Sequence, residues 1–129
     1  MWQSIIFCLG LATVLLPIRF SLLYAATSPQ TGVGACYSNR LIGHRVSSGA
    51  RYDPKAMTAA HARIPLGTHI KVTNLDNGKS AVVLVNDRLS AHAGGGIIVD
   101  LSRHACQELG FGRGGEAKVR LEEAASGAN

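Results

Sequence analysis

The sequence predicts a small, mainly β protein whose sheet closes into a barrel. Residues 68–74 alternate apolar and polar side chains, which is the pattern of a half-buried strand. The Asn77-Gly78 pair that follows favours a hairpin turn, and residues 80–85 are almost wholly apolar, as in a strand buried on both faces. A chain of 129 residues has few elements with which to cover both faces of a sheet. Closure into a barrel covers them without additional helices.

The other elements are shorter and are predicted in chain order. Residues 33–38 are expected to form the first strand, whereas residues 39–66, rich in Gly, Ser, His and Arg, show no sustained period. An irregular connection of that length is more often functional than idle. Toward the C-terminus the sequence predicts a strand over residues 96–99 and a helix over residues 102–109, which Gly110 ends. A last strand is predicted over residues 117–121.

The composition is that of one folded domain. Hydrophobic residues make up 47% of the chain and charged residues 16%, with 15 glycines and 4 prolines. These values exclude a disordered chain, and the length excludes a two-domain enzyme. Thirteen Lys and Arg against eight Asp and Glu give a net charge of +5. Such a charge indicates an anionic partner, with nucleic acid, a membrane surface and an acidic polymer as the alternatives.

Residues 1–26 are predicted to be a signal peptide. An apolar run over residues 5–17 is too short for a comfortable membrane span and leads to small residues at 25–28. Two features depart from the usual signal, because no Lys or Arg precedes the run and Arg19 interrupts the apolar region. The alternatives are an uncleaved membrane anchor and lipidation of Cys8.

Export sets the expectations for location, partners and cysteine chemistry. The domain, residues 32–123, is expected in the periplasm or outside the cell, followed by a flexible tail over residues 124–129. We expect no nucleic-acid partner and no stable membrane span after signal cleavage, with tethering to the membrane if the signal is retained.

In an oxidising compartment Cys36 and Cys106 are able to form a disulfide, and two unpaired thiols are the alternative. No CxxC motif or His/Cys cluster predicts a metal site, and no cofactor is expected.

Polar residues follow several predicted strands, at places where loops leave a rigid scaffold. The candidates are Asp87 and Arg88 after residues 80–85, Asp100 after residues 96–99, and His61, Tyr52 and Asp53 in the long connection. A carboxylate at the end of a buried strand is only partly solvated, so its pKa rises toward the range of a general acid.

Each candidate also has a structural alternative. For Asp87 and Arg88 it is a turn with a surface ion pair, and for Asp100 it is a cap on the following helix. For Asp53 it is a turn or a helix cap, and for His61 it is a structural role with its hydrogen bonds satisfied.

Five stretches of sequence, taken in series, are far more specific than any single motif. They are Ser48–His61, Ile64–Thr68, Val72–Gly78, Val85–Arg88 and Ile98–Ser102. In their order and spacing they resemble the rare lipoprotein A (RlpA) family, and the resemblance covers about Gly32 to Glu122. It implies a six-stranded double-psi β-barrel with one or two short helices, a fold shared with expansins and barwin-like proteins.

The resemblance also implies an activity on peptidoglycan. Characterised RlpA relatives are lytic transglycosylases that prefer glycan strands stripped of stem peptides. Such an enzyme cleaves between N-acetylmuramic acid and N-acetylglucosamine, and the muramoyl C6 hydroxyl closes an anhydro ring in place of water. A single carboxyl group can protonate the leaving oxygen and then take the proton of that hydroxyl, unlike the two-carboxylate scheme of ordinary glycosidases.

The same resemblance implies roles for individual residues. Asp100 or Asp87 is expected to be the acid/base, with His61 orienting it or the substrate through a hydrogen bond. We expect these three side chains to meet in one open groove that admits a sugar strand. The expected substrate-binding residues are Tyr52, which offers a flat face to a sugar ring, and Asp53, Arg88 and Tyr37. Arg88 has the alternative role of tying down its loop.

Three departures from the family pattern bear on activity. Ala50 stands where the family usually has a glutamate thought to matter for cleavage, and a methyl group cannot donate a proton. Residues 89–96 replace the family's Gly-Pro-Phe by a longer glycine-rich loop, and residues 34–37 lack the Trp of a common Trp-Tyr pair. No SPOR-type module for binding naked glycan is expected after Glu123. The alternatives to a transglycosylase are a non-catalytic, expansin-like wall-binding barrel and a barrel that binds another protein.

Overall fold

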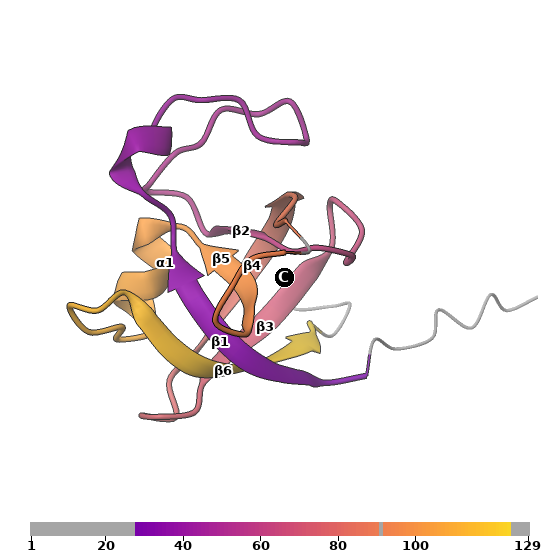
Figure 1. Ribbon diagram of the computed structural model, residues 1–129. Helices are drawn as coiled ribbons and strands as arrows, with labels where there is room; N and C mark the ends of the chain where they lie inside the picture. Colours follow the sequence, from indigo (N-terminus) through magenta and orange to yellow (C-terminus); the bar gives the residue numbers. More distant parts are fainter. Residues whose placement is uncertain (1–27, 91, 125–129) are drawn as a thin grey trace, which may run out of the picture.

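The computed structural model describes residues 28–90 and 92–124, in which six strands form a closed barrel (Figure 1). The strands are β1 (Gln30–Cys36), β2 (Thr58–Ala60), β3 (His69–Asn74), β4 (Ser80–Asp87), β5 (Ile97–Leu101) and β6 (Glu116–Glu123). Two short helices accompany them, the 3₁₀ turn η1 (Asn39–Leu41) and the α-helix α1 (Arg103–Glu108). The predicted mainly β class, with six strands and one or two short helices, is confirmed. The predicted signal peptide, residues 1–26, and residues 125–129 of the predicted tail lie outside the described residues.

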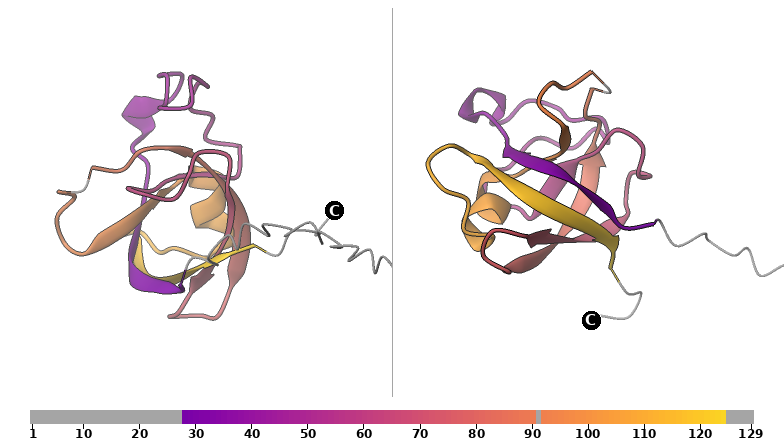
Figure 2. Two further views of the ribbon diagram at one scale, coloured as in Figure 1. Left: turned by 90° about the vertical axis from the view of Figure 1, so that its right-hand side faces the viewer. Right: turned by 60° about the horizontal axis from the view of Figure 1, so that its bottom comes forward.

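Around the barrel the strands follow the order β1-β5-β2-β4-β3-β6. The pairs β1–β5 and β2–β4 are parallel, and the other pairs are antiparallel. The first and last strands lie side by side, with Gln30 opposite Leu121 and Ala35 opposite Glu116 (Figure 2). Closure of the barrel pairs every strand on both sides and so leaves no open sheet edge.

The β3–β4 hairpin forms where the sequence predicts it, but its second strand is buried on one face only. Gly78 takes a positive φ of 76°, as the Asn77-Gly78 pair predicts for the turn. In β4, Val83 and Val85 are fully buried, whereas Val82 is 45% exposed. The predicted burial of both faces is therefore wrong, because the interior of a barrel receives only alternate side chains of each strand.

Aliphatic side chains from β2 to β6 fill the barrel core, and α1 adds Ala105 and Cys106 to it. Helix α1 begins at an N-cap serine, since the Ser102 side chain accepts a hydrogen bond from the Ala105 amide at 3.3 Å. The cap that the sequence allowed for Asp100 is therefore supplied by Ser102. No helix in residues 28–90 and 92–124 has the length and apolar character needed to cross a membrane.

A disulfide joins Cys36, at the end of β1, to Cys106 in α1, and the two Cα atoms are 6.2 Å apart. Of the two alternatives that the sequence left open, the structure contains the bond. It links positions separated by 70 residues and fastens α1 to the end of β1.

Residues 38–57, here called the covering loop, lie above β2 in the view of Figure 1. Backbone hydrogen bonds order this loop, from Tyr52 N to His44 O at 2.8 Å and from Val46 N to Ala50 O at 2.8 Å. The short strand β2 follows it within the connection that showed no sustained period in the sequence. Three residues are too few to carry a detectable alternation, so sequence patterning did not predict β2.

Candidate active site

Two carboxylates flank Ala60 of β2. Ala60 is paired with Asp87 of β4 on one side and with Asp100 of β5 on the other. Residues directly opposite one another in neighbouring strands share one face of a sheet. A register shift between Ala59 and Ala60 places Asp87, in place of Asn86, opposite Ala60. Bulges of this kind re-aim side chains, and this one brings both carboxylates to the same face of the barrel wall.

The floor of this site is a small apolar cluster separate from the barrel core. It contains Tyr37, Tyr52 and Ala60, with Val46 and Leu89 packed against them. The two tyrosine rings stack with their centroids 4.7 Å apart, and Tyr37 and Tyr52 are only 6% and 4% exposed. The prediction that Tyr52 offers an open face to a sugar ring is therefore wrong, and the Tyr37 ring is enclosed in the same way. The Tyr37 hydroxyl instead bonds Asp87, and the Tyr52 ring packs against that of Tyr37.

Asp87 accepts four hydrogen bonds. Its Oδ1 atom accepts from the Ser47 amide at 2.9 Å, the Ser47 hydroxyl at 2.7 Å and the Arg88 amide at 2.8 Å. Its Oδ2 atom accepts from the Tyr37 hydroxyl. Burial acts to raise the pKa of Asp87, but these hydrogen bonds outweigh it and hold the pKa below its usual range. Asp87 is therefore a stable carboxylate, and it anchors the covering loop through Ser47.

Asp100 has the opposite electrostatic environment. Burial and then the negative charge of Asp87 raise the pKa of Asp100 above its usual range. Its carboxyl group makes no hydrogen bond to another described residue that would offset these effects. Burial and the hydrogen bond to Asp87 likewise raise the pKa of the Tyr37 phenol, which therefore remains a donor. Two neighbouring carboxyl groups with pKa values shifted in opposite directions are the pattern of an acid paired with a fixed negative charge.

The His61 imidazole is enclosed and fully bonded. The side chain is 4% exposed, and its Nδ1 atom accepts hydrogen bonds from the Arg63 and Ile64 amides at 3.0 and 2.9 Å. Since Nδ1 is an acceptor, Nε2 carries the proton and donates to Gln30 Oε1 at 3.0 Å. Both ring nitrogens are thus occupied within the fold.

The imidazole consequently does not reach either carboxylate. Burial, followed by the positive charges of Arg88 and Arg63, lowers the pKa of His61 and keeps the ring neutral. The expectation that the His61 ring orients the acid is corrected, because only its backbone amide contacts Asp87, donating to the carbonyl oxygen at 3.2 Å. Of the three side chains expected in one open groove, the structure brings together those of Asp87 and Asp100.

Arg88 and Asp53 have the structural roles that were their alternatives. The Nη1 atom of Arg88 donates to the carbonyl oxygens of His61 and Ile64 at 2.9 and 2.6 Å, which ties the two loops together. Oδ1 of Asp53 accepts from the Lys55 amide at 2.9 Å and forms a turn. Neither geometry needs a substrate, so we do not propose either residue as a sugar ligand.

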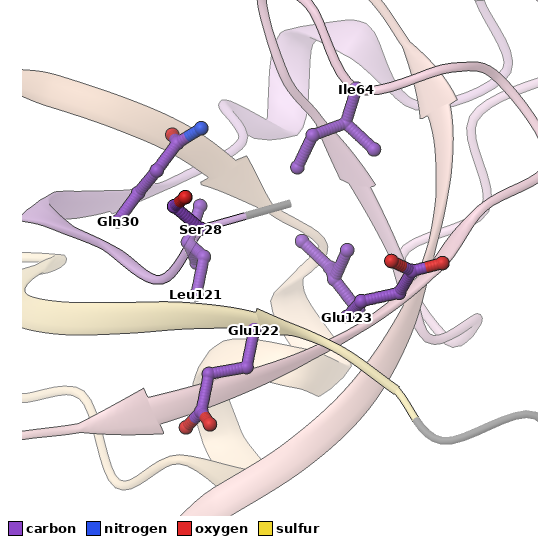
Figure 3. A pocket seen from close by; sticks show the side chains of 7 residues that line it. Ser28, Gln30, Ile64, Leu121, Glu122 and Glu123 are labelled. Carbon is purple, nitrogen blue, oxygen red and sulfur yellow. The ribbon is translucent and has the colours of Figure 1, made fainter. Parts of the chain in front are cut away.

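Two clefts open on the surface of the described residues, and neither Asp87 nor Asp100 is among the residues that line them. One of about 290 Å³ is bounded by His61, Leu89 and Ile98, and another of about 530 Å³ is bounded by Lys55 and Arg103. A third pocket lies at the other end of β1, between Gln30, Ile64 and Leu121 (Figure 3). Its volume of about 10 Å³ has room for about one water molecule and excludes a sugar.

Ser47 is part of the site, through its hydrogen bonds to Asp87, and was not predicted from the sequence. It directly precedes the first stretch that resembles the RlpA family, and a single serine in an irregular loop carries no local signal. Its pairing with Asp87 spans 40 positions and is visible only in three dimensions. Among residues 28–90 and 92–124, no three His, Cys, Asp or Glu side chains are grouped as metal ligands.

Comparison with known proteins identifies the family. A family model described as "Lytic transglycolase" matches residues 22–121. The endolytic peptidoglycan transglycosylase RlpA of Neisseria meningitidis serogroup A is 45% identical over 98 residues, covering 76% of this chain and 40% of that protein. RlpA of Vibrio cholerae is 45% identical over 93 residues, covering 72% of this chain and 35% of that protein. The chain belongs to the RlpA-like family of double-psi β-barrel proteins, and it spans less than half the length of these curated relatives.

Solved structures show the same fold at low sequence identity. An expansin of Clavibacter michiganensis in complex with cellohexaose superposes with a TM-score of 0.61 at 20% identity, covering 78% of this chain and 52% of the expansin. The Streptomyces papain inhibitor superposes with a TM-score of 0.59 at 19% identity, covering 76% of this chain and 96% of the inhibitor. At such identities these likenesses establish the fold alone, since one fold serves many functions.

Proposed function

We propose that this protein is a peptidoglycan lytic transglycosylase that acts outside the cytoplasm, with Asp100 as its acid/base. The observation that carries the proposal is the pair of carboxyl groups beside Ala60, whose pKa values are shifted in opposite directions. The curated names of the relatives, endolytic peptidoglycan transglycosylase, supply the reaction class. The proposed substrate is the glycan strand without stem peptides.

The proposed reaction uses Asp100 twice. The protonated Asp100 gives its proton to the oxygen that links N-acetylmuramic acid to N-acetylglucosamine, and the C1–O bond of the muramoyl residue breaks. The resulting Asp100 carboxylate takes the proton of the muramoyl C6 hydroxyl as that oxygen bonds to C1. The products are a 1,6-anhydro-muramoyl end and a free N-acetylglucosamine hydroxyl, and Asp100 is again protonated. A raised pKa suits both steps, because the group must be an acid first and a base afterwards.

Asp87 has a different proposed role. Its four hydrogen bonds keep it ionised, so it is poorly suited to deliver a proton. A fixed negative charge beside the reacting sugar stabilises the positive charge that develops at C1. The same charge raises the pKa of Asp100 and keeps that residue ready as the acid.

Two observations support a location outside the cytoplasm. The Cys36–Cys106 disulfide is of the kind that persists in oxidising compartments. The apolar segment within residues 1–26 is proposed to direct export, and peptidoglycan itself is an extracytoplasmic polymer. The periplasm and the extracellular space both meet these requirements.

A second candidate function is binding of the wall polysaccharide without cleavage. Ala50 favours it, because this residue replaces a family glutamate and cannot transfer a proton. Ala50 lies exposed in the covering loop, where its backbone bonds to Val46 and to Ser48. The two functions differ in whether the Asp100 carboxyl group is sufficient for catalysis.

The products of one incubation separate the two functions. Purified protein is incubated with sacculi that an amidase has stripped of stem peptides, and the soluble fragments are analysed by mass spectrometry. The proposed function predicts fragments that end in anhydro-muramic acid. Binding to the sacculi without any such fragments would instead establish the second candidate.

A further inference from the structure

A positively charged surface lies where the covering loop meets the start of α1, the helix that follows β5. Its main part is a cleft of about 530 Å³, here called the arginine cleft, lined by Pro54, Lys55, Arg103, His104 and Gln107. An adjoining cleft of about 230 Å³ shares Arg103 and Gln107 and adds Arg113. Arg103 therefore stands between two hollows, both of which carry basic side chains.

The walls of the arginine cleft are held in place by hydrogen bonds. The His104 amide donates to the Pro54 carbonyl at 2.9 Å, and the His104 ring Nδ1 donates to the Lys55 carbonyl at 2.7 Å. The Arg103 amide donates to the Tyr52 hydroxyl at 3.2 Å. The start of α1 is thus fixed to the end of the covering loop, and a fixed cleft loses little entropy when it binds a ligand.

The basic side chains of this cleft are available to a ligand. Neither the Lys55 ammonium nor the Arg103 guanidinium makes a hydrogen bond or an ion pair with a described residue. None of the residues that line the cleft carries a carboxylate. The hydrogen bond to the Lys55 carbonyl and then the Glu108 carboxylate raise the pKa of His104. Its Nε2 atom is 3.3 Å from Glu108 Oε1, so the charge of Glu108 offsets that of a protonated His104, and the positive charge of the cleft comes from Lys55 and Arg103. Guanidinium groups with open donors are suited to carboxylates, which they bind through paired hydrogen bonds.

The arginine cleft adjoins the proposed acid. Arg103 is three positions after Asp100, so their Cα atoms are at most about 11 Å apart. The Tyr52 hydroxyl that holds Arg103 belongs to the ring that stacks on Tyr37, and Tyr37 in turn bonds Asp87. Arg103 is therefore close enough to Asp100 for one glycan strand to contact both residues.

We infer that the arginine cleft binds the free lactyl carboxylate of muramic acid residues that carry no stem peptide. In a peptide-bearing strand this carboxyl carbon is an amide and is neutral, whereas in a stripped strand it is an anion. Lys55 and Arg103 then recognise a carboxylate on the lactyl group itself, which a peptide-bearing strand lacks at that position. This inference rests on the proposed function, since it assigns a specificity site for the same substrate.

Binding of glycan strands to charge variants tests the inference. The double variant Lys55→Gln/Arg103→Gln is compared with Lys71→Gln/Lys118→Gln, which removes the same charge from exposed residues of β3 and β6 that line neither cleft. Affinity for stripped strands is measured by isothermal titration at low salt. We expect about tenfold weaker binding for the cleft variant and less than a twofold change for the control. Equal affinity of the two double variants would overturn the inference.

Chemical changes to the strand test it without any variant. Wild-type protein is titrated with the same strands after their carboxylates have been converted to amides, and with inorganic polyphosphate. We expect amidation to weaken binding to the extent that the cleft variant does. Undiminished affinity for amidated strands, or polyphosphate binding of equal strength and equal dependence on Arg103, would refute recognition of the lactyl carboxylate.

The failure of this inference is distinguishable from failure of the proposed function. If the wild-type protein releases no anhydro products but its binding still depends on Lys55 and Arg103, the function fails and the cleft assignment holds. If it releases those products while the cleft variant binds stripped strands normally, the function holds and the cleft assignment fails.

Discussion

The hydroxyl of Tyr37 donates a hydrogen bond to Oδ2 of Asp87, a residue 50 positions later in the chain. The bond joins the residue that follows β1 to the last residue of β4. It also contributes to the low pKa of Asp87, and the Asp87 charge in turn contributes to the high pKa of Asp100. A tyrosine enclosed by other side chains thus influences the protonation of the proposed acid through an intermediate carboxylate.

Replacing Tyr37 by Phe removes this donor and leaves the stacked ring in place. We expect the pKa of Asp87 to rise and the free energy of unfolding to fall by about 1 kcal/mol, because a hydrogen bond to a charged acceptor is lost at a partly exposed site. The measurements are a carbon-detected NMR titration of Asp87 and chemical denaturation. Tyr52→Phe is the matched control, because the Tyr52 hydroxyl bonds the Arg103 amide and not Asp87. An equal change in the pKa of Asp87 in both variants would show that the Tyr37 hydroxyl does not lower that pKa.

The stability of the fold is expected to respond in opposite ways to neutralisation of the two carboxyl groups. A carboxyl group with a lowered folded pKa stabilises the fold above its unfolded pKa of about 3.9, and this stability is lost as the pH falls through the folded value. Asp87→Asn should therefore lower the melting temperature at pH 7 by several degrees.

For Asp100 the sign is reversed. A raised folded pKa means that stability declines as the pH rises from about 3.9 through the folded value. Asp100→Asn should therefore raise the melting temperature at pH 7, by less than the equivalent of about 1 kcal/mol because solvent screens the site. Calorimetry of both variants between pH 3 and pH 8 measures this, and a loss of stability in Asp100→Asn at pH 7 would be the contrary result.

Ser47 fixes the covering loop to Asp87, so its hydroxyl should contribute more to stability than the hydroxyl of Ser48. Ser47→Ala removes a 2.7 Å hydrogen bond to Asp87, whereas Ser48 only accepts a 3.4 Å bond from the Ala50 amide. We expect Ser47→Ala to cost about 1 kcal/mol of stability and to speed proteolytic cleavage within residues 38–57. Ser48→Ala should behave as wild type, and identical cleavage rates for the two variants would be evidence against the anchor.

The disulfide should be a large part of the stability of so small a domain. In the chain-entropy account, a bond between residues 70 positions apart contributes about 4 kcal/mol. Cys36→Ser combined with Cys106→Ser should therefore lower the free energy of unfolding by roughly that amount, as measured by denaturation with urea. A change below about 1 kcal/mol would show that the packing of α1 against β1 is sufficient without the bond.

Sequence patterning predicted those parts of the fold whose signals are local. The hairpin of β3 and β4 and the helix α1 are each encoded by periodicity and by nearby turn or cap residues, and both were located within two residues of their observed bounds. β2 was missed because three residues carry no period, although Ala60 in this strand holds the two carboxylates apart. The bulge that selects Asp87 over Asn86 is equally invisible, since it depends on a partner strand.

Within the site too, only the residues with a local signal in the sequence were predicted correctly. Asp87 and Asp100 were identified because each follows a predicted apolar strand, which is a local property, although Asp100 lies within β5 in the structure. The enclosure of His61, the stacking of Tyr37 on Tyr52 and the anchor at Ser47 depend on segments brought together by barrel closure. Composition and spacing carry no information on whether an aromatic ring faces solvent or another ring. The role of Tyr52 as an open face for a sugar ring was therefore predicted wrongly.

In the proposed reaction the Asp100 carboxyl group transfers the proton in bond cleavage. The most direct measurement is the rate at which Asp100→Asn and wild-type protein release anhydro-muramoyl fragments from amidase-treated sacculi, with folding of the variant verified by calorimetry. We expect the folded variant to lose activity by a factor of about 10² to 10⁴, the usual contribution of a general acid. Release of these fragments by Asp100→Asn at the wild-type rate would show that Asp100 is not the acid.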